Sequence, residues 1–281
     1  LPFLDQYFAG YYASAGSGDI TRLANAKQIF SAPMSMLAQA AGVASLPFFS
    51  QLWAKGKQFE FAVGVADSVS RVVALALLAA SAMIALARPI VGLLFGGGRF
   101  TPNDVHLTAH FFALYALSLF LWSAQAIYAR AFYAAGITWL PMLASTVITI
   151  AAFPLYRLGY GWQGTAGLAL ASDAGIAIQA VTLAVLLHQR RMVSLASLDF
   201  SELGRCLLAA VTSGAGVWVV VWSLDSLFGH LAGANLPTHL RWADATMLLA
   251  GMAAWLAITK WTLEKAGSAL PRVTMKRLGF R

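Results

Sequence analysis

The sequence predicts an all-α polytopic membrane protein with about seven full transmembrane helices and the end of an eighth. Of its 281 residues, 59% are hydrophobic and only 11% are charged, whereas a soluble globular domain carries about 25% charged residues. Seven nearly charge-free stretches reach the length of about 20 residues that a helix needs to cross a bilayer. These stretches are continuously apolar and do not alternate, which argues against a transmembrane barrel.

Residues 1–14 are the first element. They are apolar and have neither an initiator methionine nor a basic leader, so we expect the end of a truncated transmembrane helix and not a signal peptide. The first full span, residues 28–50, lies in the charge-free interval between Lys27 and Lys55.

Three further spans follow along the chain. Residues 61–87 form the second span, because a charge-free run can be extended back through an acid near its start. The third and fourth spans, 105–129 and 137–156, lie in uncharged intervals that only Arg130 separates.

The last three spans complete the set. Residues 163–188 are apolar except for one acid, Asp173. Residues 204–228 and 244–263 form the final pair, the latter continuing past Lys260.

The distribution of basic residues predicts a cytoplasmic C-terminus, because Lys and Arg concentrate in cytoplasmic loops of membrane proteins. With that orientation, 13 of the 19 basic residues face the cytoplasm. The six on the outer side are Arg22, Lys27, Arg88, Arg99, Arg157 and Arg241. The net charge of +8 therefore indicates contact with anionic lipid and not with nucleic acid.

Ionisable residues at membrane depth are candidate functional residues, because an unpaired charge is costly there. Lys27, at the outer start of a span, is a candidate contact for an anionic substrate, with Arg22 as weaker support; an interfacial lysine that snorkels to the surface is the alternative. Asp173 is a candidate ion or proton site, or a hydrogen-bonded structural acid. Asp67 and Arg71 have the spacing and order of a helical ion pair, which neutralises itself or takes part in gating.

The sequence gives no sign of an enzyme. It contains no catalytic triad, and its single Cys206 leaves too little for a thiolate metal site. His106 and His110 have the i, i+4 spacing of metal ligands but lack the accompanying glutamate of a zincin, so interfacial histidines are expected. No metal and no cofactor are therefore predicted.

Four local patterns, in order along the chain, resemble the MviN/MurJ family of lipid II flippases. The most specific is the segment from Pro89 to Phe95 followed by a Gly-Arg-Phe-Thr run and Asp104. The full set is Leu46-Pro47-Phe48-Phe49-Ser50; Pro89-Ile90-Val91-Gly92-Leu93-Leu94-Phe95 with Gly98-Arg99-Phe100-Thr101 and Asp104; Tyr115-Ala116-Leu117 with Ala129-Arg130-Ala131-Phe132-Tyr133-Ala134, Thr138 and Pro141; and Gly167-Leu168-Ala169-Leu170-Ala171.

The resemblance implies a transporter with fourteen helices, in two six-helix lobes and a final pair. This chain would hold the end of helix 7 and helices 8 to 14: a truncated helix in 1–14, a second-lobe bundle in 15–200, and two terminal helices with a basic cytoplasmic tail in 201–281. Such flippases move lipid II, an undecaprenyl-pyrophosphate-linked disaccharide-pentapeptide, across the bacterial inner membrane by alternating access. The resemblance implies a cationic cavity for the head group, a groove for the lipid tail between the terminal helices, and a first lobe that this chain lacks.

The chain departs from the family pattern at two places. Family members often carry an Asp-Arg pair at the start of helix 8, where this chain has Lys27 and Gln28. Some members bind sodium through helix 11, at positions that are Ala152 and Tyr156 here, so that sodium site is not expected. Asp5 and Asp173 are the acids left for a coupling ion, proton or sodium.

Two alternatives to lipid II transport stay open at this point. One is an exporter of another polyprenyl-linked saccharide, or a small-molecule antiporter of the same superfamily. The other is a non-transporting membrane scaffold for cell-wall synthesis, which the lost Asp-Arg pair and the missing lobe favour. All of these functions place the chain in a bacterial inner membrane among membrane lipids.

Overall fold

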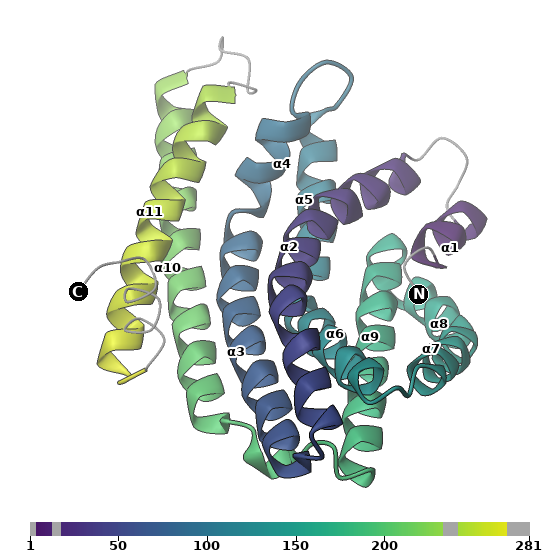
Figure 1. The fold of residues 1–281 in the computed structure, drawn as a ribbon. Coiled ribbons are helices and arrows are strands. Elements are labelled where there is room, and N and C mark those ends of the chain that lie inside the picture. The colour runs from purple at the N-terminus through teal and green to yellow at the C-terminus, as the bar shows by residue number, and fades with distance from the viewer. Residues whose placement is uncertain (1–3, 13–17, 233–240, 269–281) are drawn as a thin grey trace.

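A computed structural model describes residues 4–12, 18–232 and 241–268, and these residues form helices and no strand (Figure 1). In chain order they are α1 (Leu4–Tyr12), α2 (Asp19–Ala54), α3 (Gln58–Ala85), α4 (Ala87–Phe95), α5 (Pro102–Leu117), α6 (Leu119–Ala134), α7 (Trp139–Ala151), α8 (Phe153–Gln163), α9 (Thr165–Gln189), the 3-10 turn η1 (Leu195–Ser197), α10 (Phe200–Ala232) and α11 (Arg241–Lys265).

The predicted class is confirmed, because several helices are long and apolar enough to cross a membrane. Within the described residues these are α3, α9, α10 and α11, and the number rises to six if the pairs α5–α6 and α7–α8 each count as one span. Helix α2 is not part of that count, so its identity as a span stays a prediction.

Two of the predicted spans are bent where straight helices were expected. The span 105–129 breaks at Ser118 by 41°, and the span 137–156 breaks at Ala152 by 43°. Pro154 lies in the first turn of α8 and lacks the backbone N–H that would continue the α7 ladder. The Ser118 hydroxyl donates to the carbonyl of Tyr115 at 2.9 Å, a side-chain bond that often bends helices.

Helix α2 begins earlier than the sequence indicated. The first full span was expected to begin at residue 28, but α2 already starts at Asp19 and so contains both Arg22 and Lys27. An acid in the first turn favours a helix start because it interacts with the exposed N–H groups, and Asp19 also pairs with Arg22 at 2.7 Å. Both cations are therefore held on a rigid element.

The helices pack around two main hydrophobic clusters. One surrounds Tyr115 and Tyr156 between α1, α2, α5, α8 and α9, and the other surrounds Phe49, Phe61 and Phe132 where α2, α3 and α6 meet. Figure 1 shows α11 and α10 side by side along one edge, next to α3, with α1, α7 and α8 at the opposite edge. Helix α10 thus packs on the bundle through α3, and α11 packs on α10 and α4.

Helices α8 and α9 cross at two glycines, which allow the backbones to touch. A Cβ placed on Gly159 would meet the carbonyl oxygen of Gly167, and a Cβ on Gly167 would meet that of Gly159. In lipid, no hydrophobic effect drives helices together. Their association depends on close van der Waals packing, which small residues at a crossing permit. This crossing holds α8, and with it Tyr156, against α9.

We expect Gly159→Ala to lower the free energy of unfolding by about 1–3 kcal/mol, because the added methyl group overpacks the crossing. Gly161→Ala is the matched control on the same helix, since a Cβ there has nothing within 4 Å. It should be neutral or stabilising by up to about 1 kcal/mol from the gain in helix propensity. Thermal unfolding of the detergent-solubilised protein checks this, and equal midpoints for the two variants would contradict the crossing.

Candidate functional site

A buried ion pair joins α1 to α2. The Lys27 ammonium donates to both carboxylate oxygens of Asp5, each at 2.6 Å, and the Asp5 side chain is fully buried while that of Lys27 is 15% exposed. The Tyr115 hydroxyl from α5 also donates to Asp5, and the Lys27 nitrogen lies 5.5 Å from the centre of the Tyr115 ring. Asp5 thus accepts hydrogen bonds from two other helices.

Asp173 from α9 belongs to the same cluster. Its carboxylate oxygens are enclosed by protein, and the group interacts electrostatically with Lys27 and Asp5 and lies beside the Ser118 hydroxyl. The cluster therefore holds two acids and one base, which gives it a net charge of −1 when all three groups are ionised. A buried excess charge is costly, so a proton or a small cation would be stabilised here.

Arg22 lies in a second network, one turn and a half before Lys27. Its guanidinium pairs with Asp19 at 2.7 Å and with Asp104 at 2.5 Å. Asp104 also accepts from Thr101 in a capping box at the start of α5, and Asp19 accepts from Thr165 of α9. Arg22 therefore joins α2 to α5 and, through Asp19, to α9.

The ion pair expected between Asp67 and Arg71 is not formed. Both residues are exposed on α3, and no ion pair links them among the side chains that the structure describes. An exposed i, i+4 pair contributes only about 0.3–0.5 kcal/mol, which is too little to fix two solvent-facing side chains.

Sequence reasoning missed the tyrosines around the acids. Tyr115 entered only as part of a family pattern, and Tyr156 only as a position where a sodium ligand is absent. The Tyr115 hydroxyl donates to Asp5, 110 positions away in the chain, and no local spacing reports such a contact. The one available signal was that a tyrosine in an apolar span needs a partner for its hydroxyl.

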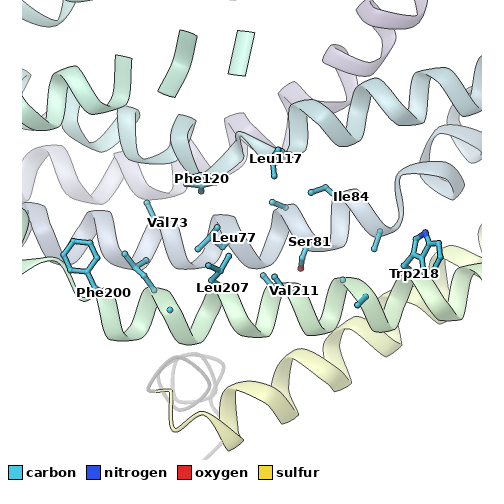
Figure 2. Close-up of a pocket in the computed structure, with 17 residues that line it drawn as sticks. Val73, Leu77, Ser81, Ile84, Leu117, Phe120, Phe200, Leu207, Val211 and Trp218 are labelled. Carbon is cyan, nitrogen blue, oxygen red and sulfur yellow. The ribbon is translucent and has the colours of Figure 1, made fainter. Parts of the chain in front are cut away.

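An apolar groove runs along the other side of the bundle, between α10 and α3 (Figure 2). It has a volume of about 730 Å³, and the α5–α6 bend contributes Leu117 and Phe120 to its wall. This groove is lined by α10 and not by α11, and the lipid-tail groove between the two terminal helices stays a prediction. Helix α11 instead packs on α10 and α4, and its Trp255 indole donates to the Ser81 hydroxyl of α3 at 3.1 Å.

The described residues offer no cluster of three His, Cys, Asp or Glu side chains that could hold a metal ion. What the described residues do present is an ion pair in the bundle interior and an apolar groove.

Comparisons with known proteins point to one family. The family model described as lipid II flippase MurJ matches residues 3–232. A Bdellovibrio bacteriovorus protein described as a probable lipid II flippase MurJ is 29% identical over 224 residues, covering 78% of this chain and 42% of that protein. A Rhizobium meliloti protein with the same description is 26% identical over 269 residues, covering 94% of this chain and 49% of that protein.

A solved structure titled lipid II flippase MurJ, inward closed conformation, shares the fold with a TM-score of 0.67 at 16% identity. The match covers 94% of this chain and 51% of that one, so the chain spans about half the length of the proteins it matches. Because the family model covers most of its residues, the chain belongs to the lipid II flippase MurJ family.

Proposed function

We propose that this chain is the second-lobe half of a flippase that moves lipid II from the inner to the outer leaflet of a bacterial inner membrane by alternating access. Residues 1–14 end a helix of the carrier, 15–200 form the second lobe, and 201–281 form the terminal pair with a cytoplasmic C-terminus. A first lobe, encoded with this chain or supplied as a partner, completes the cavity.

The proposal rests on one observation: the same helical bundle holds a buried cation and an open apolar groove. An amphiphile with an anionic head and a long tail requires both environments. Lys27 supplies a positive charge inside the helices of the second lobe, and the α3–α10 groove supplies apolar surface along the bundle. A soluble substrate would not need the apolar surface of the groove.

In the proposed mechanism, Lys27 exchanges partners. In the present conformation its ammonium is bound to Asp5, and a pyrophosphate entering the cavity competes for the same charge. When Lys27 moves to the substrate, Asp5 and Asp173 are left as two enclosed acids that take up the coupling ion, a proton or sodium. Arg22 is a secondary head-group contact, since a guanidinium has five donors and can bind a phosphate oxygen beside Asp104.

We expect Lys27→Ala to abolish or strongly weaken the rescue of flippase-depleted cells by the full-length protein. The variant removes the head-group cation, but it also leaves Asp5 buried without its partner, which costs about 3–5 kcal/mol. The measurement is growth after depletion, normalised to the amount of protein in the membrane.

The double variant Asp5→Asn with Lys27→Gln separates the two effects. It removes both charges, so the bundle should regain stability, while the cation stays absent. Transport should therefore remain lost although the protein accumulates normally. Full rescue by the double variant would mean that Lys27 serves only to neutralise Asp5, and a wild-type protein that inserts but does not rescue would refute transport itself.

We expect Asp173→Asn to lower transport and to remove its response to an imposed proton or sodium gradient, because the cluster no longer carries an excess negative charge. Flipping of a fluorescent lipid II analogue in proteoliposomes, with and without each gradient, measures this. Glu264→Gln, on an exposed acid of α11, is the control and should keep the wild-type response. An unchanged gradient response in Asp173→Asn would make this acid purely structural.

A further inference from the structure

A second pocket lies beside the groove, near the end of α3 and the start of α5. Its volume of about 320 Å³ is at the lower end of the range for ligand pockets, about 300–1,000 Å³. Ile84, Ala85 and Trp218 line both spaces, which are therefore adjacent. Under the predicted topology this pocket lies on the outer side of the membrane, at the level of the lipid head groups.

The pocket differs from the groove in its charge pattern. Its charged lining residues are one base, Arg88 of α4, and one acid, Asp225 of α10. His106 and His110, both exposed on α5, line it as well, and an imidazole donates a hydrogen bond even when neutral. The lining thus offers one positive and one negative group, with no net charge, and two further hydrogen-bond donors.

Aromatic side chains lie on the same face of α10 as the acid. Trp218, Trp222 and Asp225 follow one another at spacings of four and three residues, which places them along one face of a helix. Both indoles line the pocket and are about 60% exposed, as expected of tryptophans at a membrane interface. A tryptophan ring attracts a cation above its face. An ammonium group in this pocket therefore has both a carboxylate and an indole as partners.

Arg88 and Asp225 are each other's partners in the present structure. They form an ion pair whose side chains are 52% and 38% exposed. An exposed pair contributes little to stability, so a ligand can separate the two at small cost. A purely anionic ligand would pair with Arg88 and leave Asp225 beside its negative charge. A ligand that carries both a phosphate and an ammonium gives each residue a new partner.

This pocket is separate from the buried cluster around Lys27. His106 and Tyr115 are nine residues apart on one helix, which places their side chains about 180° apart at 3.6 residues per turn. Tyr115 donates to Asp5 on its own face, whereas His106 lines the pocket between α4 and α10. The two sites therefore lie on opposite faces of α5.

We propose that this pocket binds the phosphoethanolamine head group of a phosphatidylethanolamine molecule in the outer leaflet. The phosphate accepts hydrogen bonds from Arg88, His106 and His110. The ammonium donates to Asp225 beside the Trp222 ring, and the acyl chains stay in the surrounding bilayer. This lipid is a resident of the membrane and not the substrate of the proposed carrier, so the inference goes beyond the proposed function.

The test is native mass spectrometry of the delipidated full-length protein, titrated separately with dioleoyl phosphatidylethanolamine, phosphatidylcholine and phosphatidylglycerol. The ethanolamine lipid should bind most tightly, because the choline group has no N–H to donate to Asp225 and the glycerol group has no cation. Arg88→Gln should weaken its binding about tenfold, the effect of losing one charge-assisted hydrogen bond. Asp225→Asn should weaken it by a similar factor and bring it level with the choline lipid.

The exposed ion pair between Lys57 and Glu60, at the other end of α3, provides matched controls. Its side chains are 50% and 54% exposed, and neither lines the pocket. Lys57→Gln and Glu60→Gln should therefore leave lipid binding unchanged. Trp222→Leu should weaken binding about two- to fivefold through the loss of a cation–π contact. Trp162→Leu, which changes an exposed indole of α8, should have no effect.

Glycerophosphoethanolamine, the same head group without acyl chains, distinguishes a lipid from a soluble ligand. It should bind more weakly than the lipid, and equal or tighter binding would overturn the assignment to a membrane lipid. Phosphatidylglycerol bound as tightly as phosphatidylethanolamine would overturn the zwitterionic head group, and phosphatidylcholine bound as tightly would overturn the role of Asp225. Binding that is insensitive to both Arg88→Gln and Asp225→Asn would overturn the site itself.

Discussion

The contact between Asp5 and Lys27 is the interaction on which the rest of the site depends. Two ionised groups inside a helical bundle are stabilised only while they remain paired and hydrogen-bonded, so this contact fixes α1 against α2. Tyr115 extends the constraint to α5, and Asp173 extends it to α9. Four helices thus share one electrostatic centre, and any rearrangement of α1 requires a new partner for Lys27.

The two faces of α5 separate the charged cluster around Asp5 from the apolar groove. On one face Tyr115 donates to the buried acid Asp5, and on the other Leu117, at the α5–α6 bend, lines the groove. Helix α11 packs on α10 and α4 and leaves open the side of α10 that faces α3. Helix α10 therefore provides one wall of the groove, and α3 with the α5–α6 bend provides the other.

Much of the fold could be predicted from the sequence, because charge-free runs report burial in lipid directly. The boundaries of α9 and α11 fall within three residues of the predicted 163–188 and 244–263. The bend at Ser118 could not be predicted, since a serine within an apolar span carries no specific signal, whereas Pro154 did mark the second bend. The partners of Arg22 were also unpredictable, because Asp104 lies 82 residues away in the chain. The residue types show which groups are costly to bury. Only the three-dimensional structure shows which partners offset that cost.

The α5–α6 bend is where the two halves of the site come closest in the chain. Tyr115 donates to Asp5, and Leu117, only two residues later, lines the groove. The next residue is Ser118, whose hydroxyl donates to the Tyr115 carbonyl and also lies beside Asp173. A straight helix would turn these neighbours through 200° at 100° per residue and continue in register. The helix instead bends by 41° at this point, and Phe120 in the first turn of α6 joins Leu117 in the wall of the groove. The serine at the bend therefore lies between the apolar groove and the acids that neutralise Lys27.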